Sequence, residues 1–227
     1  MFFIYRVLIN LIILFSPLII LVRIIKNKED KFRFKEKFCF FSKKRGNGKL
    51  IWFHGSSVGE ILSIIPLIEK LEKKNKIDKI LVTSSTLSSS KVLSRFKLNK
   101  TIHQFFPIDS DILAKKFLNY WQPSAAIFIE SEIWPNILKN VRKKNIPLIL
   151  LNARITKKSF NRWKMIPYIS KKLFESFDIC FSQNQETRKH LKHLGAKKIK
   201  SLGNLKFSES KSQKNYNFDN KLKKIFK

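Results

Sequence analysis

Residues 50–72 read LIWFHGSSVGEILSIIPLIEKLE and decide the fold class of this chain. The run 50–53 is short and apolar, as strands buried on both faces of a sheet tend to be. A loop of glycine and serine follows. Apolar side chains then recur on one face of a helix, with charged ones outside it; they are Ile61, Ile64, Ile65, Ile68 and Leu71. A strand that leads directly into an amphipathic helix is the first half of a βαβ unit.

The same alternation continues along the chain. Further strands are predicted at 80–83, 103–106, 125–129, 148–151, 179–182 and 199–202. Helical patterns lie between some of them, at 111–120, 137–144 and 185–194. Alternating strands and helices predict a parallel sheet that is covered by helices on both faces. We therefore expect an α/β fold, a Rossmann-like doubly wound parallel sheet, over residues 49–208.

The first 25 residues form a separate element that is almost continuously apolar. Residues 8–22 carry no charge, and a helix needs about 20 residues to cross the hydrocarbon core. We predict a membrane-anchor helix over residues 1–25, either spanning the bilayer or lying deep in its interface. A cleaved signal peptide and a buried core helix are the alternatives, and the first lacks a small-x-small cleavage site. The basic residues that follow predict that the remaining chain lies on the cytoplasmic side.

The chain carries 47 Lys and Arg residues against 16 Asp and Glu residues, a formal net charge of +31. Such a charge attracts polyanions, whether nucleic acid or an anionic lipid surface. A compositional bias toward Lys, Asn, Ile and Phe explains the charge equally well, because it places Lys on every solvated face. Cys39 and Cys180 show no metal-ligand or disulfide-framework spacing, so we expect no metal site and a cytoplasmic domain. Residues 26–48 are interpreted as a basic linker, and residues 209–227 as a basic tail or the start of an interdomain linker.

Polar side chains gather after the predicted strands. In open α/β sheets, ligands bind beyond the carboxyl ends of the strands. The loops at that end contribute His54, Ser56, Ser57, Gly59 and Glu60 after the first strand, Glu130 and Glu132 after the fourth, Asn152 and Arg154 after the fifth, and Lys206 after the last. A simpler explanation for at least one of Glu130 and Glu132 is the ordinary preference for acidic residues at a helix amino terminus. The simpler explanation for Lys206 is a solvated surface charge. Because these polar side chains gather at one end of the predicted sheet, we nevertheless expect the functional site at the carboxyl ends of the strands.

The first loop allows two chemical interpretations. The pattern G-x-S-x-G at 55–59 formally matches the nucleophile elbow of α/β-hydrolases, with Ser57 as nucleophile and His190 or His193 as its base. Alternatively, the glycines let a sugar or phosphate approach the backbone, and Glu60 faces the ligand as a base. Glu60 could also only cap the helix, where a carboxylate contributes about 0.3–1 kcal/mol.

Several motifs, in order along the chain, resemble those of the bacterial 3-deoxy-D-manno-octulosonic acid (Kdo) transferases. They are the run 51–66 with His54, Ser56, Val58-Gly59-Glu60 and Pro66; Glu130-Ser131-Glu132-Ile133-Trp134-Pro135-Asn136; Ile146-Pro147-Leu148 with Asn152-Ala153-Arg154; Gln183-Asn184; Leu194-Gly195-Ala196; and Gly203-Asn204-Leu205-Lys206-Phe207. Each motif is weak alone, but the E-S-E-x-W-P-N run and the ordered set are specific. A short amino-terminal membrane helix followed by a basic segment is also a property of that family.

The resemblance implies the amino-terminal domain of a GT-B glycosyltransferase, an inverting and metal-independent enzyme without a cofactor. Its implied reaction moves Kdo from CMP-Kdo to the lipid A precursor, lipid IVA, in lipopolysaccharide core biosynthesis. By position, Glu60 matches the family's general base, while Glu130 and Lys206 match groups that stabilise the transition state. The residues expected near the acceptor are His54, Ser56, Ser57, Gly59, Glu132, Asn152 and Arg154. The protein would lie at the inner membrane, with its globular domain facing the cytoplasm.

The resemblance also implies a second, donor-binding domain, which is absent from these 227 residues. The isolated chain is therefore expected to be inactive or nearly so. Its expected partners are the lipid A precursor, the membrane, and CMP-Kdo held through the missing carboxyl-terminal domain, with no nucleic acid. Two alternatives remain at this level: a serine hydrolase that uses Ser57, and a membrane-tethered basic protein that binds polyanions.

Overall fold

The computed structural model describes residues 2–205, and within them it contains one sheet of seven parallel strands in the order β3-β2-β1-β4-β5-β6-β7. The strands are β1 (Leu50–His54), β2 (Lys79–Ser84), β3 (Thr101–Phe105), β4 (Ala125–Ile129), β5 (Leu148–Ala153), β6 (Ile179–Ser182) and β7 (Ile199–Ser201). The predicted α/β fold with a doubly wound parallel sheet is confirmed, and the predicted strand bounds agree within two residues. Lys206 and the predicted tail at 209–227 lie outside the described residues.

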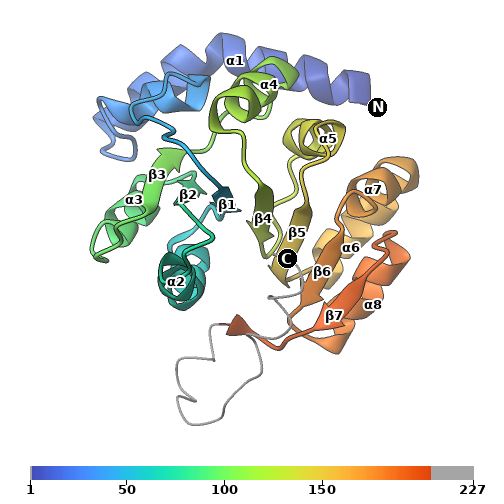
Figure 1. The fold of residues 1–227 in the computed structure, drawn as a ribbon. Coiled ribbons are helices and arrows are strands. Elements are labelled where there is room, and N and C mark those ends of the chain that lie inside the picture. Colours follow the sequence, from blue (N-terminus) through green and yellow to red (C-terminus); the bar gives the residue numbers. More distant parts are fainter. Residues whose placement is uncertain (1, 206–227) are drawn as a thin grey trace.

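Helices cover both faces of the sheet, with α4 and α5 on one face and α2 on the other (Figure 1). The helices are α1 (Phe2–Ile25), the 3-10 helix η1 (Arg33–Phe38), α2 (Val58–Glu72), α3 (Leu87–Leu93), α4 (Asp111–Trp121), α5 (Pro135–Lys143), α6 (Lys157–Lys164), α7 (Pro167–Phe174) and α8 (Gln185–His193). Along β1, Leu50 and Trp52 enter the apolar cluster on the α4 and α5 side, while Ile51 and Phe53 enter the cluster on the α2 side. This alternation is the period of two that a strand imposes on its side chains.

Three short helices and the 3-10 helix were not predicted from the sequence. They are α3, α6, α7 and η1, which are six to eight residues long. A helical period of apolar residues needs a window of about 11–18 residues to be recognised. Three of the seven residues of α3 are serine, and Phe160 and Trp163 are the only large apolar residues of α6, so neither helix shows a repeated apolar period in the sequence.

The segment 26–48, expected as a basic linker, is partly folded onto the domain. Glu36 and Cys39 are buried. The ring of Phe41 stacks on Tyr120 with 3.8 Å between the ring centroids. Arg45 Nε donates a hydrogen bond to a backbone carbonyl at the end of α4, over 3.0 Å. Residues 33–45 therefore pack as part of the domain rather than as a free tether.

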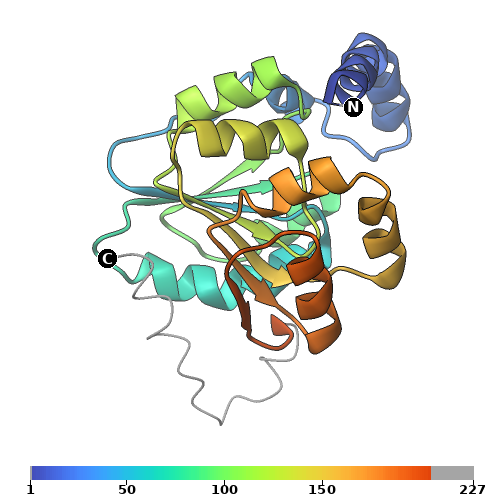
Figure 2. The same ribbon diagram turned by 90° about the vertical axis from the view of Figure 1, so that its right-hand side faces the viewer.

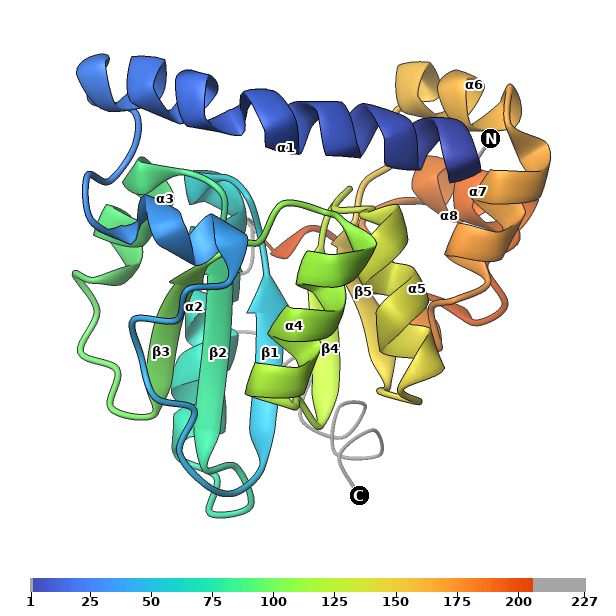
Figure 3. The ribbon, with the colours of Figure 1, turned by 90° about the horizontal axis from the view of Figure 1, so that it is seen from above.

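Helix α1 lies along the end of the domain to which the carboxyl ends of the strands point (Figures 2 and 3). A narrow stripe of the helix contacts the domain. In that stripe Ile9 and Ile20 are buried, and Tyr5 Oη donates to Asp109 Oδ2 over 2.6 Å. Within the described residues, Val7–Ile25 is long and apolar enough to cross a membrane, with mean hydropathy 2.6 and 11% of its length buried. Most of its apolar surface is thus exposed.

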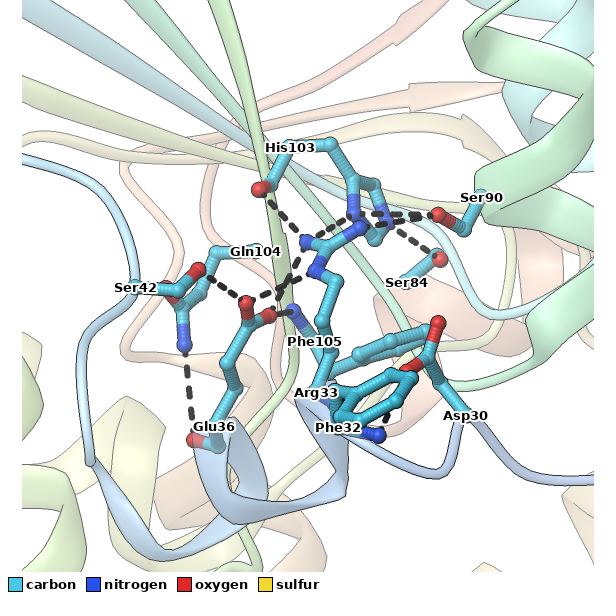
Figure 4. Close-up of polar contacts among 10 residues, drawn as sticks. All are labelled: Asp30, Phe32, Arg33, Glu36, Ser42, Ser84, Ser90, His103, Gln104 and Phe105. Carbon is cyan, nitrogen blue, oxygen red and sulfur yellow. Dashed lines mark hydrogen bonds and ion pairs between the residues drawn. The ribbon is translucent and has the colours of Figure 1, made fainter.

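A partly buried ion pair within η1, between Arg33 and Glu36, contacts the edge strand β3 (Figure 4). Arg33 donates Nε to Glu36 Oε1 over 2.8 Å and Nη2 to Glu36 Oε2 over 3.0 Å. Glu36 is 1% exposed, and its Oε2 also accepts the backbone N–H of Phe105 over 2.8 Å. Burial, together with the Arg33 charge, lowers the pKa of His103 to about 3, so the neutral ring accepts from Arg33 at Nδ1. These contacts satisfy an N–H group on the open edge of the sheet, which would otherwise invite pairing with other chains.

We expect the substitution Glu36→Gln to lower the free energy of unfolding by about 2–3 kcal/mol, because it leaves the partly buried Arg33 cation without its partner. Lys35→Gln is the matched control, since Lys35 is the exposed neighbour on the same 3-10 helix. It should change stability by less than about 0.5 kcal/mol. Denaturant titration of both variants in detergent measures the difference, and equal midpoints would contradict the structural role of Glu36.

Candidate active site

The candidate site lies where the strand order reverses. β1 pairs with β2 on one side and with β4 on the other. The chain leaves β1 for α2 on one face of the sheet and leaves β4 for α5 on the opposite face. In doubly wound sheets, ligands bind at the carboxyl ends of two such strands, because their loops diverge there.

Ser57 begins α2 as its N-cap, with its Oγ accepting the backbone N–H of Glu60 over 3.3 Å. Glu60 is therefore held in the first turn of the helix. A Cβ added at Gly55 would lie 3.1 Å from the Cβ of Glu60. Glycine at this position lets the loop after β1 pass close to the glutamate side chain.

Glu60 is a buried carboxylate with a raised proton affinity. It is 9% exposed, its Oε2 accepts the backbone N–H of Ser56 over 2.8 Å, and its Oε1 accepts the hydroxyl of Ser57 over 2.8 Å. Burial and the charges of Glu132 and Glu130 raise the pKa of Glu60, although the two hydrogen bonds oppose that rise. Each carboxylate oxygen retains a second lone pair. The side chain thus caps α2 and can also take a proton, as a general base does.

Glu132 lies in the opposite electrostatic environment. Its Oε2 accepts hydrogen bonds from Ser56 Oγ over 2.6 Å, Trp134 Nε1 over 2.7 Å and His54 Nε2 over 3.0 Å. Burial alone would raise the pKa of Glu132, but these three donors outweigh it and lower the pKa. Glu132 is therefore a fixed, ionised group, and its charge contributes to the raised pKa of Glu60.

His54 ties three elements together. Its side chain is fully buried, and its ring stacks on Phe106 with 3.7 Å between centroids. Nδ1 lies 3.0 Å from Thr83 Oγ1 at the end of β2, while Nε2 contacts Glu132 in the loop after β4. One imidazole thus fixes the loop after β4 relative to the ends of β1 and β2.

Two residues without the freedom of glycine have a left-handed backbone at the ends of neighbouring strands. They are Glu130, with φ of 56°, and Asn152, with φ of 54°. Glu130 is 6% exposed and Asn152 is fully buried, with Asn152 Oδ1 accepting the N–H of Leu205 over 3.1 Å. Strained backbone of this kind persists only where the surrounding structure holds it, and it concentrates at functional sites.

The remaining predicted residues differ in exposure. Gly59 is partly exposed in the first turn of α2, while the side chain of Arg154 is exposed and its backbone N–H donates to Glu130 O over 3.3 Å. Lys206 lies beyond the described residues, directly after Leu205. Hydrogen bonds of their side chains join His54, Ser56, Ser57, Glu60 and Glu132 into one cluster.

Several contact residues have no role in the sequence prediction. Trp134 donates to Glu132, and Ser85 Oγ lies 3.1 Å from Ser56 Oγ. Both stand in loops at the predicted edge of the sheet, but the sequence did not assign either of them to the site. Thr83, which contacts His54, and Phe106, which stacks on it, depend on pairing between distant strands and carry no comparable mark in the sequence.

The hydrolase arrangement is not formed. Ser57 Oγ donates to Glu60 Oε1. His190 Nδ1 bonds a backbone carbonyl over 2.9 Å, and its ring stacks on Phe160 with 4.1 Å between centroids. His193 also lies against Phe160, at 5.2 Å. Among the described residues, the structure pairs neither histidine with Ser57.

The fold is similar to that of a UDP-N-acetylglucosamine 2-epimerase from Neisseria meningitidis, solved with bound UDP-N-acetylglucosamine. The TM-score is 0.52 at 14% sequence identity, over 78% of this chain and 54% of that one. At this identity the likeness concerns the fold alone, a Rossmann-like domain.

Sequence comparison is more specific. A curated 3-deoxy-D-manno-octulosonic acid transferase of Rickettsia bellii is 38% identical over 193 residues, which are 85% of this chain and 46% of the relative. The corresponding protein of Haemophilus influenzae is 26% identical over 208 residues, 87% of this chain and 48% of the relative. The chain spans about half the length of these relatives, as the resemblance implied. A family model for 3-deoxy-D-manno-octulosonic-acid transferase (kdotransferase) matches residues 32–209, and the chain belongs to this glycosyltransferase family.

Proposed function

We propose that this chain supplies the acceptor-side half and the catalytic base of an enzyme that transfers Kdo from CMP-Kdo to the lipid A precursor in lipopolysaccharide assembly. The observation that supports this proposal is the pair of carboxylates with opposite pKa shifts at the carboxyl edge of the sheet, the buried Glu60 and the partly buried Glu132. Carboxyl groups whose environments push their pKa values apart are typical of divided acid–base roles. Membership of the family supports the class of donor and acceptor.

In the proposed step, ionised Glu60 takes the proton of the acceptor hydroxyl while the hydroxyl oxygen bonds to the anomeric carbon of Kdo. The bond from that carbon to the phosphate oxygen of CMP breaks, and its electron pair leaves with CMP. Attack opposite the leaving group inverts the configuration. We assign Glu130 and Lys206 to balancing the charge of the oxocarbenium-like sugar and the departing phosphate, and no metal or cofactor takes part.

Burial divides the proposed acceptor residues into two groups. His54 and Asn152 are fully buried, so we assign them to positioning the loops rather than to touching the acceptor. Ser56, Ser57, Gly59 and Arg154 keep exposed surface. The exposed guanidinium of Arg154 suits a phosphate on the acceptor, because its planar fork binds phosphate oxygens in pairs. Glu132 orients Ser56 through its 2.6 Å hydrogen bond.

A lipid acceptor requires the site to face a membrane. Helix α1 lies at the same end of the domain as the candidate site, with most of its apolar surface exposed (Figure 3). We propose that α1 anchors the protein to the inner membrane and that the domain faces the cytoplasm. The basic residues that follow α1 support this orientation, since positive segments are retained on the cytoplasmic side.

The base is tested in a fusion of this chain to the carboxyl-terminal half of the Rickettsia bellii relative, assayed in the presence of EDTA. Glu60→Gln keeps the shape of the side chain but removes the proton acceptor, so kcat should fall by about 10²–10⁴. Glu69→Gln, an exposed position on the same helix, is the control and should retain full activity.

The stability of the variant should not fall. Because the pKa of Glu60 is raised, its ionised form disfavours folding above the ordinary glutamate pKa, and Glu60→Gln should not reduce stability at neutral pH. Activity within a few-fold of the parent would remove Glu60 as the base.

The pH dependence provides a separate test. Because Glu60 must be ionised to accept a proton, kcat/KM should rise as pH increases through its raised pKa. The Ser57 hydroxyl lowers that pKa by hydrogen bonding, so Ser57→Ala should move the acid limb of the profile to higher pH. Ser94→Ala, at an exposed serine in α3's C-cap, should leave the profile unchanged. An unmoved or downward-shifted acid limb in Ser57→Ala would contradict the assignment.

The membrane anchor is tested on the outward side of α1. Leu14 and Leu18 are 69% and 62% exposed, so the double change Leu14→Lys, Leu18→Lys leaves the domain contacts in place. Each charge at the centre of a bilayer helix costs about 2.5–3.5 kcal/mol, and the carbonate-resistant membrane fraction should fall sharply. The matching double alanine variant should remain in the membrane. A carboxyl-terminal reporter should be active in the cytoplasm, and a periplasmic signal would refute the orientation.

A further inference from the structure

The corner formed by α6 and α7 is not explained by the candidate site. Helix α6 has no buried residue, and Met165 and Tyr168 at its junction with α7 are 79% and 68% exposed. A surface helix normally buries an apolar stripe against its domain. Here only Phe160 and Trp163 of α6 pack, partly buried, against the core. The apolar tip of the corner is left facing outward.

The charged side chains around that tip are all positive. Between Arg154 and Phe174 the sequence has no Asp or Glu and seven basic residues, all of them exposed: Arg154, Lys157, Lys158, Arg162, Lys164, Lys171 and Lys172. Large apolar side chains ringed by lysine and arginine are typical of segments that lie on anionic membranes. The apolar tips enter the boundary between headgroups and acyl chains, and the cations meet lipid phosphates.

The position of the corner fits such a contact. Figures 2 and 3 show α6 and α1 at the same end of the molecule, the end to which the carboxyl ends of the strands point. Ile112 at the start of α4, next to the α1 contact, is 77% exposed as well. A bilayer surface that receives α1 therefore also lies near α6.

We propose that the α6–α7 corner is a second membrane contact, selective for anionic lipid headgroups, which together with α1 holds the carboxyl edge of the sheet against the bilayer. A membrane is favoured over nucleic acid because the apolar side chain of Met165 and the aromatic ring of Tyr168 are exposed, and because the corner lies on the side of the apolar helix α1. The inference rests on the proposed anchoring by α1 and is independent of the transfer chemistry.

The test uses the full 227-residue chain inserted through α1 into lipid nanodiscs. Met165→Cys carries an environment-sensitive fluorophore, and the native Cys39 and Cys180 are buried and do not compete for the label. The discs contain phosphatidylcholine alone or phosphatidylcholine with phosphatidylglycerol. The matched control is the label at Lys76→Cys, an exposed position before β2 at the opposite end of the sheet.

We expect a blue shift of the fluorophore at position 165 in the discs with phosphatidylglycerol, and none at position 76. The shift should be lost when Lys157→Gln and Lys158→Gln are combined with the label, and also at high salt, which screens exposed charges. Equal shifts in both kinds of disc, or at both positions, would overturn the proposal. A shift produced by an added oligonucleotide but not by anionic discs would assign the surface to nucleic acid instead. Since no sugar transfer is measured, failure of the proposed reaction would leave this result unaffected.

Discussion

The parallel pairing of β1 with both β2 and β4 is the constraint on which the rest of the molecule depends. Because the strands run in one direction, every loop that follows a strand arises at the same edge of the sheet. The loops after β1 and β4 then leave toward opposite faces, so Ser56 can contact both Glu60 and Glu132. The same pairing brings His54 within hydrogen-bond distance of Thr83. The proposed chemistry therefore depends first on the order and direction of the strands, which bring these side chains together.

Much of the fold, and the location of the site, could be predicted from local patterns. The central strands are short apolar runs, and the helices α2, α4, α5 and α8 follow an apolar period or a clear stop, so sequence reasoning found them. The rule that ligands bind beyond the carboxyl ends of strands then placed Glu60, Glu130 and Glu132 at one edge. The short helices were not predicted because α6 has no fully buried residue and three of the seven residues of α3 are serine. The burial of Glu36 was not predicted either, since it depends on the open edge of β3, far along the chain.

The opposite pKa shifts of the two central carboxylates could not be predicted, although the resemblance already pointed to Glu60 rather than Glu132 as the base. Both acids follow an apolar strand in the sequence, and no local pattern separates their proton affinities. Their difference comes from the donors that the fold supplies: His54, Ser56 and Trp134 all converge on one oxygen of Glu132, whereas Glu60 is buried beside that negative charge. The positive φ of Glu130 is likewise set by tertiary structure, because nothing in the local sequence demands it. Sequence thus identifies which groups are present, and only packing assigns their proton affinities.

The contact between Glu36 of η1 and the edge strand β3 also bears on how the domain folds during synthesis. Glu36 and its backbone partner Phe105 are separated by 69 residues. At synthesis rates of about 5–20 residues per second, the partner emerges from the ribosome roughly 3–14 s after Glu36. During that delay, the carboxylate that will cover the edge strand is still hydrated, and the edge stays open until the chain through Phe105 has been made. Under the anchoring proposed for α1, the nascent chain would already be tethered before the domain can close this edge.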